Sequence, residues 1–298
     1  MKNNLLVMRT LEPLERYLKT KHLVELIINK PKEIVLETKS GFQTISDQNL
    51  TLEYLESLAH QLATHAGQKF GDLHPILACA LPAPYYYRVQ IVGKTVVDSG
   101  FALAIRAGAA NVYPLETWFS AEIVEQLMSA LKQRKNILIS GGTSSGKTTL
   151  LNSIVALLPL EERILTIEDA KELVLPQTNA VQLLKAKMGT DAAKIAYKDL
   201  INSAVRLRPD RIILGELDID NTLPFLRVLN TGHGGSMATL HADSPDKAIE
   251  ALTLNVSLAG YGASETTIER YIKNAIDLIV HLRRESRSSY RATIKAIK

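Results

Sequence analysis

The sequence feature that most constrains the fold is the segment Gly141-Gly-Thr-Ser-Ser-Gly-Lys-Thr-Thr149. It follows the apolar run Asn136-Ile-Leu-Ile-Ser140 and precedes a segment with helical periodicity. Its spacing, G-x-x-x-x-G-K-[ST] between a strand and a helix, predicts a phosphate-binding loop. Glycines let the backbone curl so that successive N–H groups converge on phosphate oxygens, and the following helix adds its positive dipole end. The chain is therefore expected to form an α/β fold with this loop at the end of one strand.

The loop also predicts which atoms meet a nucleotide. Lys147 is expected to reach the β- and γ-phosphates, and the Thr148 hydroxyl is expected to ligate Mg²⁺. The motif by itself fits either ATP or GTP. The expected nucleotide-binding residues of the loop are Gly141, Gly142, Thr143, Ser144, Ser145, Gly146, Lys147, Thr148 and Thr149.

Periodicity divides the chain of 298 residues into two domains joined by a linker. Residues 1–106 mix helical and strand patterns and predict an N-terminal α+β domain. Residues 107–120 change in texture and predict the linker. Residues 121–298 alternate strands with helices, which predicts a doubly wound parallel sheet covered on both faces. The strands expected in this second domain are 136–140, 163–168, 211–215, 236–241 and 277–282.

Two of these expected strands end in carboxylates. The apolar run Ile212-Ile-Leu-Gly-Glu216 resembles the strand that lies beside the phosphate-loop strand in nucleotide hydrolases. Glu216 is therefore expected to polarise the attacking water. The run Arg163-Ile-Leu-Thr-Ile-Glu168-Asp169 has the same form, so Glu168 and Asp169 are expected to face the same crevice as Lys147, with one of the two ligating metal or water.

A third segment, Thr231-Gly-His-Gly-Gly-Ser-Met-Ala-Thr-Leu-His241, places two histidines around one expected strand. Two histidines eight residues apart with no third ligand nearby are a poor zinc pattern. Because His241 should lie at the carboxyl end of the strand, a sensor of the γ-phosphate fits better than a metal site.

In chain order, the four segments 141–149, 163–169, 212–216 and 231–241 resemble motifs of the secretion-superfamily traffic ATPases. These motifs are, respectively, Walker A, the Asp box, Walker B and the His box. The resemblance extends upstream, where the segment 25–37 is similar to the opening hairpin of that family's N-terminal domain, and Arg88 and Arg106 are similar to its strand arginines. The single cysteine, Cys79, excludes the four-cysteine zinc module of type II secretion ATPases. The compact ending from Asp277 to Lys298 resembles the ATPases of type IV secretion and conjugative transfer systems.

The resemblance implies an Mg²⁺-dependent ATP hydrolase with a RecA-like second domain that works as a homohexameric ring. It also implies partners among inner-membrane subunits and other ATPases of the secretion system. The catalytic residues that it implies are Glu216, Lys147 and Glu168, the metal ligands are Thr148 and Asp169, and the further nucleotide-binding residues are Arg88, Arg106 and His241. A pilus extension or retraction motor of the same superfamily, a DNA-stimulated translocase, a small-molecule kinase and a non-hydrolysing scaffold stay as alternatives.

Two residues depart from the family pattern. Ser144 stands where the family usually has glycine in the loop, so the loop needs either φ < 0 or a tolerated left-handed conformation there. Asp218 stands two residues after the Walker B glutamate, where many members have arginine, so the role of that arginine does not carry over.

The charge of the chain is concentrated at its C-terminal end. The net charge is +4, yet residues 281–298 carry six basic residues against Glu285 alone. This basic end is either a solvated surface or a weak contact for acidic lipid or nucleic acid. The first residues have too short an apolar core for a secretory signal, and no apolar run approaches a membrane span. We therefore expect a cytoplasmic protein. The basic end, together with the family resemblance, implies peripheral association with the inner face of the cytoplasmic membrane.

Overall fold

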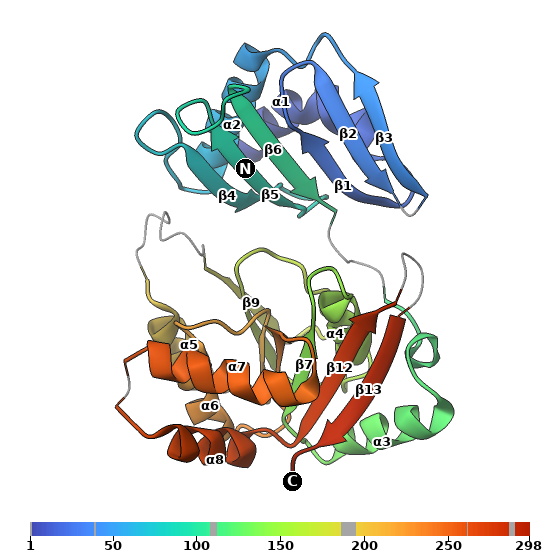
Figure 1. The fold of residues 1–298 in the computed structure, drawn as a ribbon, viewed down its shortest axis with the longest axis vertical. Helices are drawn as coiled ribbons and strands as arrows, with labels where there is room; N and C mark the ends of the chain where they lie inside the picture. Colours follow the sequence, from blue (N-terminus) through green and yellow to red (C-terminus); the bar gives the residue numbers. More distant parts are fainter. Residues whose placement is uncertain (1, 39, 108–111, 186–194, 261, 286–289) are drawn as a thin grey trace. The chain divides into compact units, whose positions relative to one another are not determined.

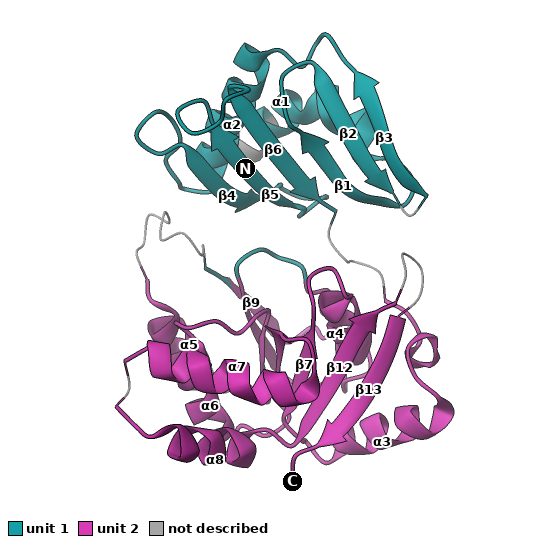
Figure 2. Cartoon of the chain, in the orientation of Figure 1, with its two compact units in different colours: residues 1–108, 169–172, 184–194 teal, residues 109–168, 173–183, 195–298 magenta. Residues whose placement is uncertain are grey.

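The computed structural model describes residues 2–38, 40–107, 112–185, 195–260, 262–285 and 290–298. The chain forms two compact units (Figure 2). Unit 1 comprises Met1–Gly108, Asp169–Glu172 and Leu184–Lys194. Unit 2 comprises Ala109–Glu168, Leu173–Leu183 and Ile195–Lys298.

Unit 1 is an α+β fold with one antiparallel sheet. The sheet has the strand order β3-β2-β1-β6-β5-β4. Two helices lie behind it in Figure 1. The elements are α1 (Lys2–Leu18), β1 (Leu23–Ile28), β2 (Glu33–Thr38), β3 (Gly41–Ser46), α2 (Leu52–His65), β4 (Ile76–Ala80), β5 (Arg88–Gly93) and β6 (Phe101–Arg106).

One face of the unit-1 sheet is buried against these helices. Alternate strand residues such as Leu26, Ile28, Val89 and Ile91 point into a single apolar core with the inner faces of α1 and α2. Cys79 belongs to this core, and burial raises the pKa of its thiol to about 12, so the thiol stays protonated at neutral pH. Strand β3 was not predicted, because its exposed residues give no clear alternation.

Unit 2 is built on a seven-stranded sheet with the order β13-β12-β7-β11-β10-β8-β9. Strands β12, β7, β11, β10 and β8 run parallel, whereas β13 pairs antiparallel with β12. The elements are η1 (Leu115–Thr117), α3 (Ala121–Lys132), β7 (Ile137–Gly141), α4 (Lys147–Val155), β8 (Ile164–Glu168), β9 (Ala180–Leu184), α5 (Tyr197–Arg206), β10 (Arg211–Leu214), α6 (Thr222–Leu229), β11 (Met237–His241), α7 (Pro245–Leu258), α8 (Glu265–Ala275), β12 (Leu278–Arg284) and β13 (Tyr290–Ala296).

Both faces of the unit-2 sheet are buried. Leu138, Ile212 and Ile279 pack with α5 to α8 in one core, with α7 in front of the sheet in Figure 1. Ile139 and Ile213 point the other way and pack with α3 and α4 in a second core. The burial of both faces explains why these strands are continuous apolar runs, and it confirms the predicted doubly wound α/β fold.

The segment for which the sequence predicts a linker contains structure of its own. It forms the short helix η1, and Leu115 and Phe119 are buried in the same core as α3 and α4. Among the described helices, none combines the length and the apolarity needed to cross a membrane.

Candidate functional site

The phosphate loop connects β7, which ends at Gly141, to α4, which begins at Lys147. Gly146 has φ +92°, a conformation that favours glycine, and a Cβ there would lie 3.3 Å from the Trp118 ring. Ser144 also has a positive φ, of +55°, so it occupies the left-handed region. The loop therefore keeps its curled shape with serine in place of the usual glycine.

Lys147 folds back over the loop. Its ammonium donates to the carbonyl oxygens of Gly141 and Gly142, each at 2.9 Å, and lies 3.2 Å from Nδ1 of His241. The lysine is 8 % exposed, so the loop largely encloses its charge. These contacts hold the ammonium at the centre of the loop, where a phosphate group would meet it.

His241 joins Lys147 to the expected catalytic carboxylate. Its Nε2 lies 3.4 Å from Oε1 of Glu216, while its Nδ1 faces Lys147. The reason lies in the order of the strands. We expected the strand that leads to Glu216 to lie beside β7, and this is wrong, because β11 lies between β7 and β10. The carboxyl end of β11 therefore places His241 between the loop and Glu216.

Glu168 lies at the carboxyl end of β8 and is 3 % exposed. Its carboxylate accepts from the Thr166 hydroxyl and from the Leu173 backbone N–H, both at 2.9 Å. It also comes close to Gly215, where a Cβ would lie 3.3 Å from the Glu168 side chain. Buried carboxylates of this kind need such donors. Glu168 therefore ties the segment after β8 to the strand end.

Arg88, Arg106 and Asp169 belong to unit 1. Arg88 and Arg106 are paired residues of the neighbouring strands β5 and β6. The Arg88 guanidinium donates to Asp169 at 2.6 Å and lies 3.5 Å from Glu172. The expected metal ligand Asp169 is therefore engaged in an ion pair with an expected phosphate-binding arginine.

Asp218, the second departure from the family pattern, shapes the start of α6. Its carboxylate accepts from the backbone N–H groups of Asp220 and Asn221, and the Asn221 side chain donates to the carbonyl of Glu216. This arrangement fixes the turn that follows Glu216. An aspartate at this position therefore has a structural role in the turn.

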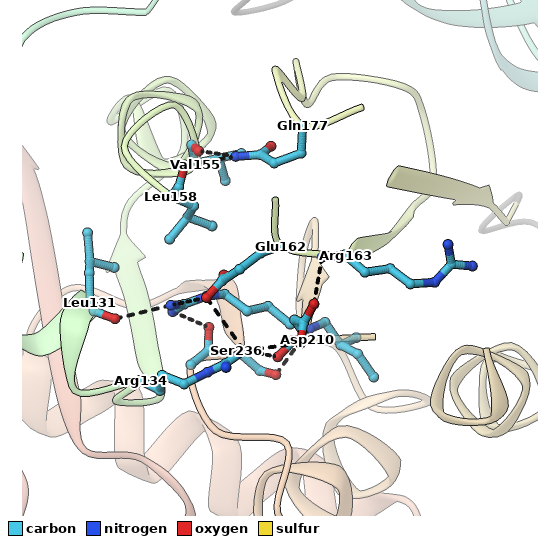
Figure 3. A network of polar contacts seen from close by, with 12 residues as sticks. Leu131, Arg134, Val155, Leu158, Glu162, Arg163, Gln177, Asp210 and Ser236 are labelled. Atoms are coloured by element: carbon cyan, nitrogen blue, oxygen red, sulfur yellow. Dashed lines mark hydrogen bonds and ion pairs between the residues drawn. The ribbon is translucent and has the colours of Figure 1, made fainter. Parts of the chain in front are cut away.

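The opposite edge of the sheet holds a buried polar network (Figure 3). Arg211 is 2 % exposed and pairs with Glu162, with contacts of 2.5 and 3.1 Å between the two groups. Arg134 donates to the carbonyl of Asp210 at 2.9 Å, and the Asp210 carboxylate accepts from the Arg163 backbone. The segment Arg208-Pro-Asp-Arg211 therefore supplies two members of this network, Asp210 and Arg211.

The two histidines of the His box separate to opposite edges of the sheet. Ser236 precedes β11, and its hydroxyl donates to the carbonyl of His233 at the network edge. His241 ends the same strand at the loop edge, paired in register with Gly141. Of the two histidines, only His241 is therefore placed to contact the phosphate loop.

One residue beside the loop was not singled out from the sequence. His281 of β12 pairs in register with Ser140, and its Nδ1 lies 3.0 Å from the Ser140 hydroxyl. Burial lowers the pKa of His281. A polar residue in each of two buried apolar strands is the signal that could have found this pair.

A curled glycine-containing loop with lysine, imidazole and carboxylate groups at one edge of a parallel sheet defines a P-loop protein of the RecA-like class. Residues 105–296 match the family described as "Type II/IV secretion system protein". The type IV secretion system protein VirB11 of Bartonella quintana is 34% identical over 94% of this chain and 89% of its own length. The type IV secretion system protein PtlH of Bordetella pertussis is 31% identical over 93% of this chain and 90% of its own length. The chain belongs to the Type II/IV secretion system protein family.

Solved structures agree in fold. The VirB11 ATPase from the Brucella suis type IV secretion system, in complex with sulphate, matches with TM-score 0.53 and 26% identity over 97% of both chains. The pilus retraction motor PilT with bound ADP matches with TM-score 0.67 over 96% of this chain and 82% of its own length. At 17% identity, the second match supports the fold alone.

Proposed function

We propose that the chain is an Mg²⁺-dependent ATP hydrolase that powers assembly of, or substrate transfer through, a type IV secretion or conjugation apparatus. The single observation that carries this proposal is that His241 lies between Lys147 of the phosphate loop and Glu216, within 3.4 Å of each. The names of the relatives support the secretion system, and the sulphate in the Brucella suis structure supports binding of a tetrahedral anion by this fold.

Nucleotide binding begins at the loop. The Lys147 ammonium rests on two backbone carbonyls, so a phosphate oxygen can replace these neutral acceptors with a charged one. The backbone N–H groups of residues 141–149 and the start of α4 would bind the remaining phosphate oxygens. Ser144 already occupies the left-handed conformation, and this supports a loop that needs no refolding to receive phosphate.

Glu216 is proposed as the residue that polarises the attacking water. It reaches the site from the end of β10, and His241 stands 3.4 Å from its carboxylate. Because His241 also faces Lys147, a γ-phosphate bound at Lys147 would change the hydrogen bonding of the imidazole. His241 is thus proposed to report the presence of γ-phosphate to Glu216.

The remaining expected residues complete the proposal. Mg²⁺, when bound, would neutralise phosphate charge, and it would be held by Thr148 and Asp169 together with phosphate oxygens and water. For Asp169 this requires exchange of its ion pair with Arg88. Glu168 is proposed to orient the water, and Arg88 and Arg106 to bind phosphate oxygens.

We propose further that the chain works as a homohexameric ring in the cytoplasm, at the inner face of the cytoplasmic membrane, with inner-membrane subunits and other ATPases of the system as partners. The proposed domains are residues 1–106 and 121–298, joined by the linker 107–120. Arg283 and Arg291 face each other on β12 and β13, which supports contact of this basic end with acidic lipid or nucleic acid.

Phosphate release from ATP tests the proposal. The wild-type chain should release phosphate in the presence of Mg²⁺, and Lys147→Ala should lower the rate to background, because the charge that binds the β- and γ-phosphates is lost. Lys273→Ala is the matched control, since this lysine forms an exposed pair within α8. Equal rates for Lys147→Ala and the wild-type chain would refute the assignment of the loop.

Two alternatives have their own outcomes. A DNA-stimulated translocase is favoured by the paired Arg283 and Arg291, and single-stranded DNA would then raise the rate of ATP hydrolysis at low salt but not at high salt. A pilus extension or retraction motor shares the fold and would show no such stimulation. A strain carrying Lys147→Ala separates the secretion ATPase from the pilus motor. A secretion defect without loss of pili supports the secretion ATPase.

A further inference from the structure

Ser140 and His281 occupy adjacent strands directly behind the phosphate loop. Strands β7 and β12 run parallel, and these two residues are paired in their register. The Ser140 hydroxyl lies 3.0 Å from Nδ1 of His281, and the two residues are 0 % and 8 % exposed. Since Ser140 is the last residue before Gly141, this hydrogen bond fixes the strand end from which the loop departs.

The imidazole also lies near a second segment of the site. The backbone of Asp243 acts on the His281 ring and opposes the lowering of its pKa by burial. A neutral imidazole has one donor and one acceptor, so Nδ1 accepts from the Ser140 hydroxyl in the tautomer that carries its proton on Nε2. Asp243 lies two residues after His241. The buried ring therefore contacts the residue at the start of the loop through its hydrogen bond with Ser140.

The surroundings of the ring favour this neutral form. Burial is the main cause that lowers the pKa of His281, and the positive charges of Arg283 and Lys147 lower it further, against the opposing charge of Asp243. At neutral pH the ring therefore keeps its acceptor nitrogen for Ser140.

The loop has little freedom to move against β12. A Cβ at Gly141 would lie 2.5 Å from the carbonyl oxygen of Leu282, so the two backbones are in direct contact. The carbonyl of Gly141 is also one of the two that accept from Lys147. A displacement of the end of β7 would therefore be transmitted to the ammonium group.

We infer that His281 is a positioning residue of the nucleotide site: through Ser140 it holds Gly141, and hence Lys147, in the geometry that receives phosphate. This inference rests on the proposed nucleotide-binding function. His281 contacts Ser140, the residue from which the loop departs, and takes no part in the chemistry.

The test measures the Kd for ATP in Ser140→Ala, in His281→Leu and in the double variant. Loss of the hydrogen bond should raise the Kd about fivefold in each single variant. The double variant should be no weaker than either single variant, because both changes remove the same contact. His281→Gln keeps an acceptor and a donor and should recover most of the affinity. The inference would be overturned if the increases in Kd of the two single variants multiplied in the double variant. It would also be overturned if both single variants folded and bound ATP with an unchanged Kd.

A control variant and a second measurement separate positioning from general loosening. Ser236→Ala removes a buried hydroxyl at the opposite edge of the same sheet and should leave the Kd for ATP unchanged. Amide hydrogen exchange of residues 141–147, measured without nucleotide, should be faster in Ser140→Ala and His281→Leu but not in Ser236→Ala. Equal acceleration in all three variants, or in none, counts against His281 as a positioning residue. Because this second readout needs no ligand, a chain that bound no ATP would refute the proposed function and still leave the inference tested.

Discussion

At the scale of single residues, the phosphate loop depends on close backbone contacts that a side chain would block. Gly141 lies against β12, and an added Cβ would stand 2.5 Å from both the carbonyl oxygen of Leu282 and the hydroxyl of Ser145. The neighbouring Gly142 has open space in the direction of its Cβ. The two adjacent glycines therefore have different requirements, although the motif treats them alike.

This difference predicts the outcome of two matched substitutions. Gly141→Ala should lower the free energy of unfolding by about 1–3 kcal/mol, because the loop or β12 must shift to make room for the methyl group. Gly142→Ala should change it by less than about 0.5 kcal/mol. Urea unfolding of both variants checks the pair. A larger loss for Gly142→Ala than for Gly141→Ala would contradict the close contact of Gly141 with β12.

At the scale of secondary-structure elements, the sheet separates two kinds of polar residue. The carboxyl ends of β7, β11 and β10 lead to Lys147, His241 and Glu216, whereas the amino ends hold the Arg211 network. Arg211 joins β10 to Glu162, to the carbonyl of Leu131 at the end of α3 and to the carbonyl of Gly235 before β11. The network is therefore expected to hold the strands together rather than to act on nucleotide.

Removal of Arg211 should be strongly destabilising. Arg211→Ala removes the guanidinium from the Glu162 carboxylate, whose 3.6 Å pair with Arg134 remains, and from two carbonyls. This loss should cost about 3–5 kcal/mol of unfolding free energy in urea. Lys273→Ala, which removes an exposed pair with Glu269, should cost less than about 0.5 kcal/mol. A joint replacement, Arg211→Leu with Glu162→Leu, should recover part of the loss. A cost below about 1 kcal/mol for Arg211→Ala would mean that the network does not support the sheet.

The elements also show what periodicity could and could not predict. The strands that lead to Lys147 and Glu216 and that end in His241 are short, mostly apolar runs buried on both faces, so the sequence predicts their position and the end of the sheet that they reach. Their order was not predictable, because a crossover helix lets β11 enter on either side of β10. The edge strands β9 and β13 lack a continuous apolar run, and the Ser140–His281 contact joins residues 141 positions apart.

At the scale of the whole molecule, the proposed assembly is a nucleotide-driven ring. In the proposed mechanism, Glu216 polarises the water that attacks ATP bound at Lys147, while His241 stands between them. Glu216→Gln keeps the size and the hydrogen-bonding capacity of the side chain but removes its negative charge. This substitution should slow hydrolysis about 100-fold or more and leave ATP binding intact. A ring that holds intact ATP should then have six times the chain mass of 32.9 kDa by mass photometry.

The most direct test is the identity of the nucleotide bound to Glu216→Gln after incubation with ATP and Mg²⁺. This variant should retain ATP, whereas the wild-type chain under the same conditions should carry ADP. If Glu216→Gln converted bound ATP to ADP at the wild-type rate, Glu216 would not be the group that polarises the water.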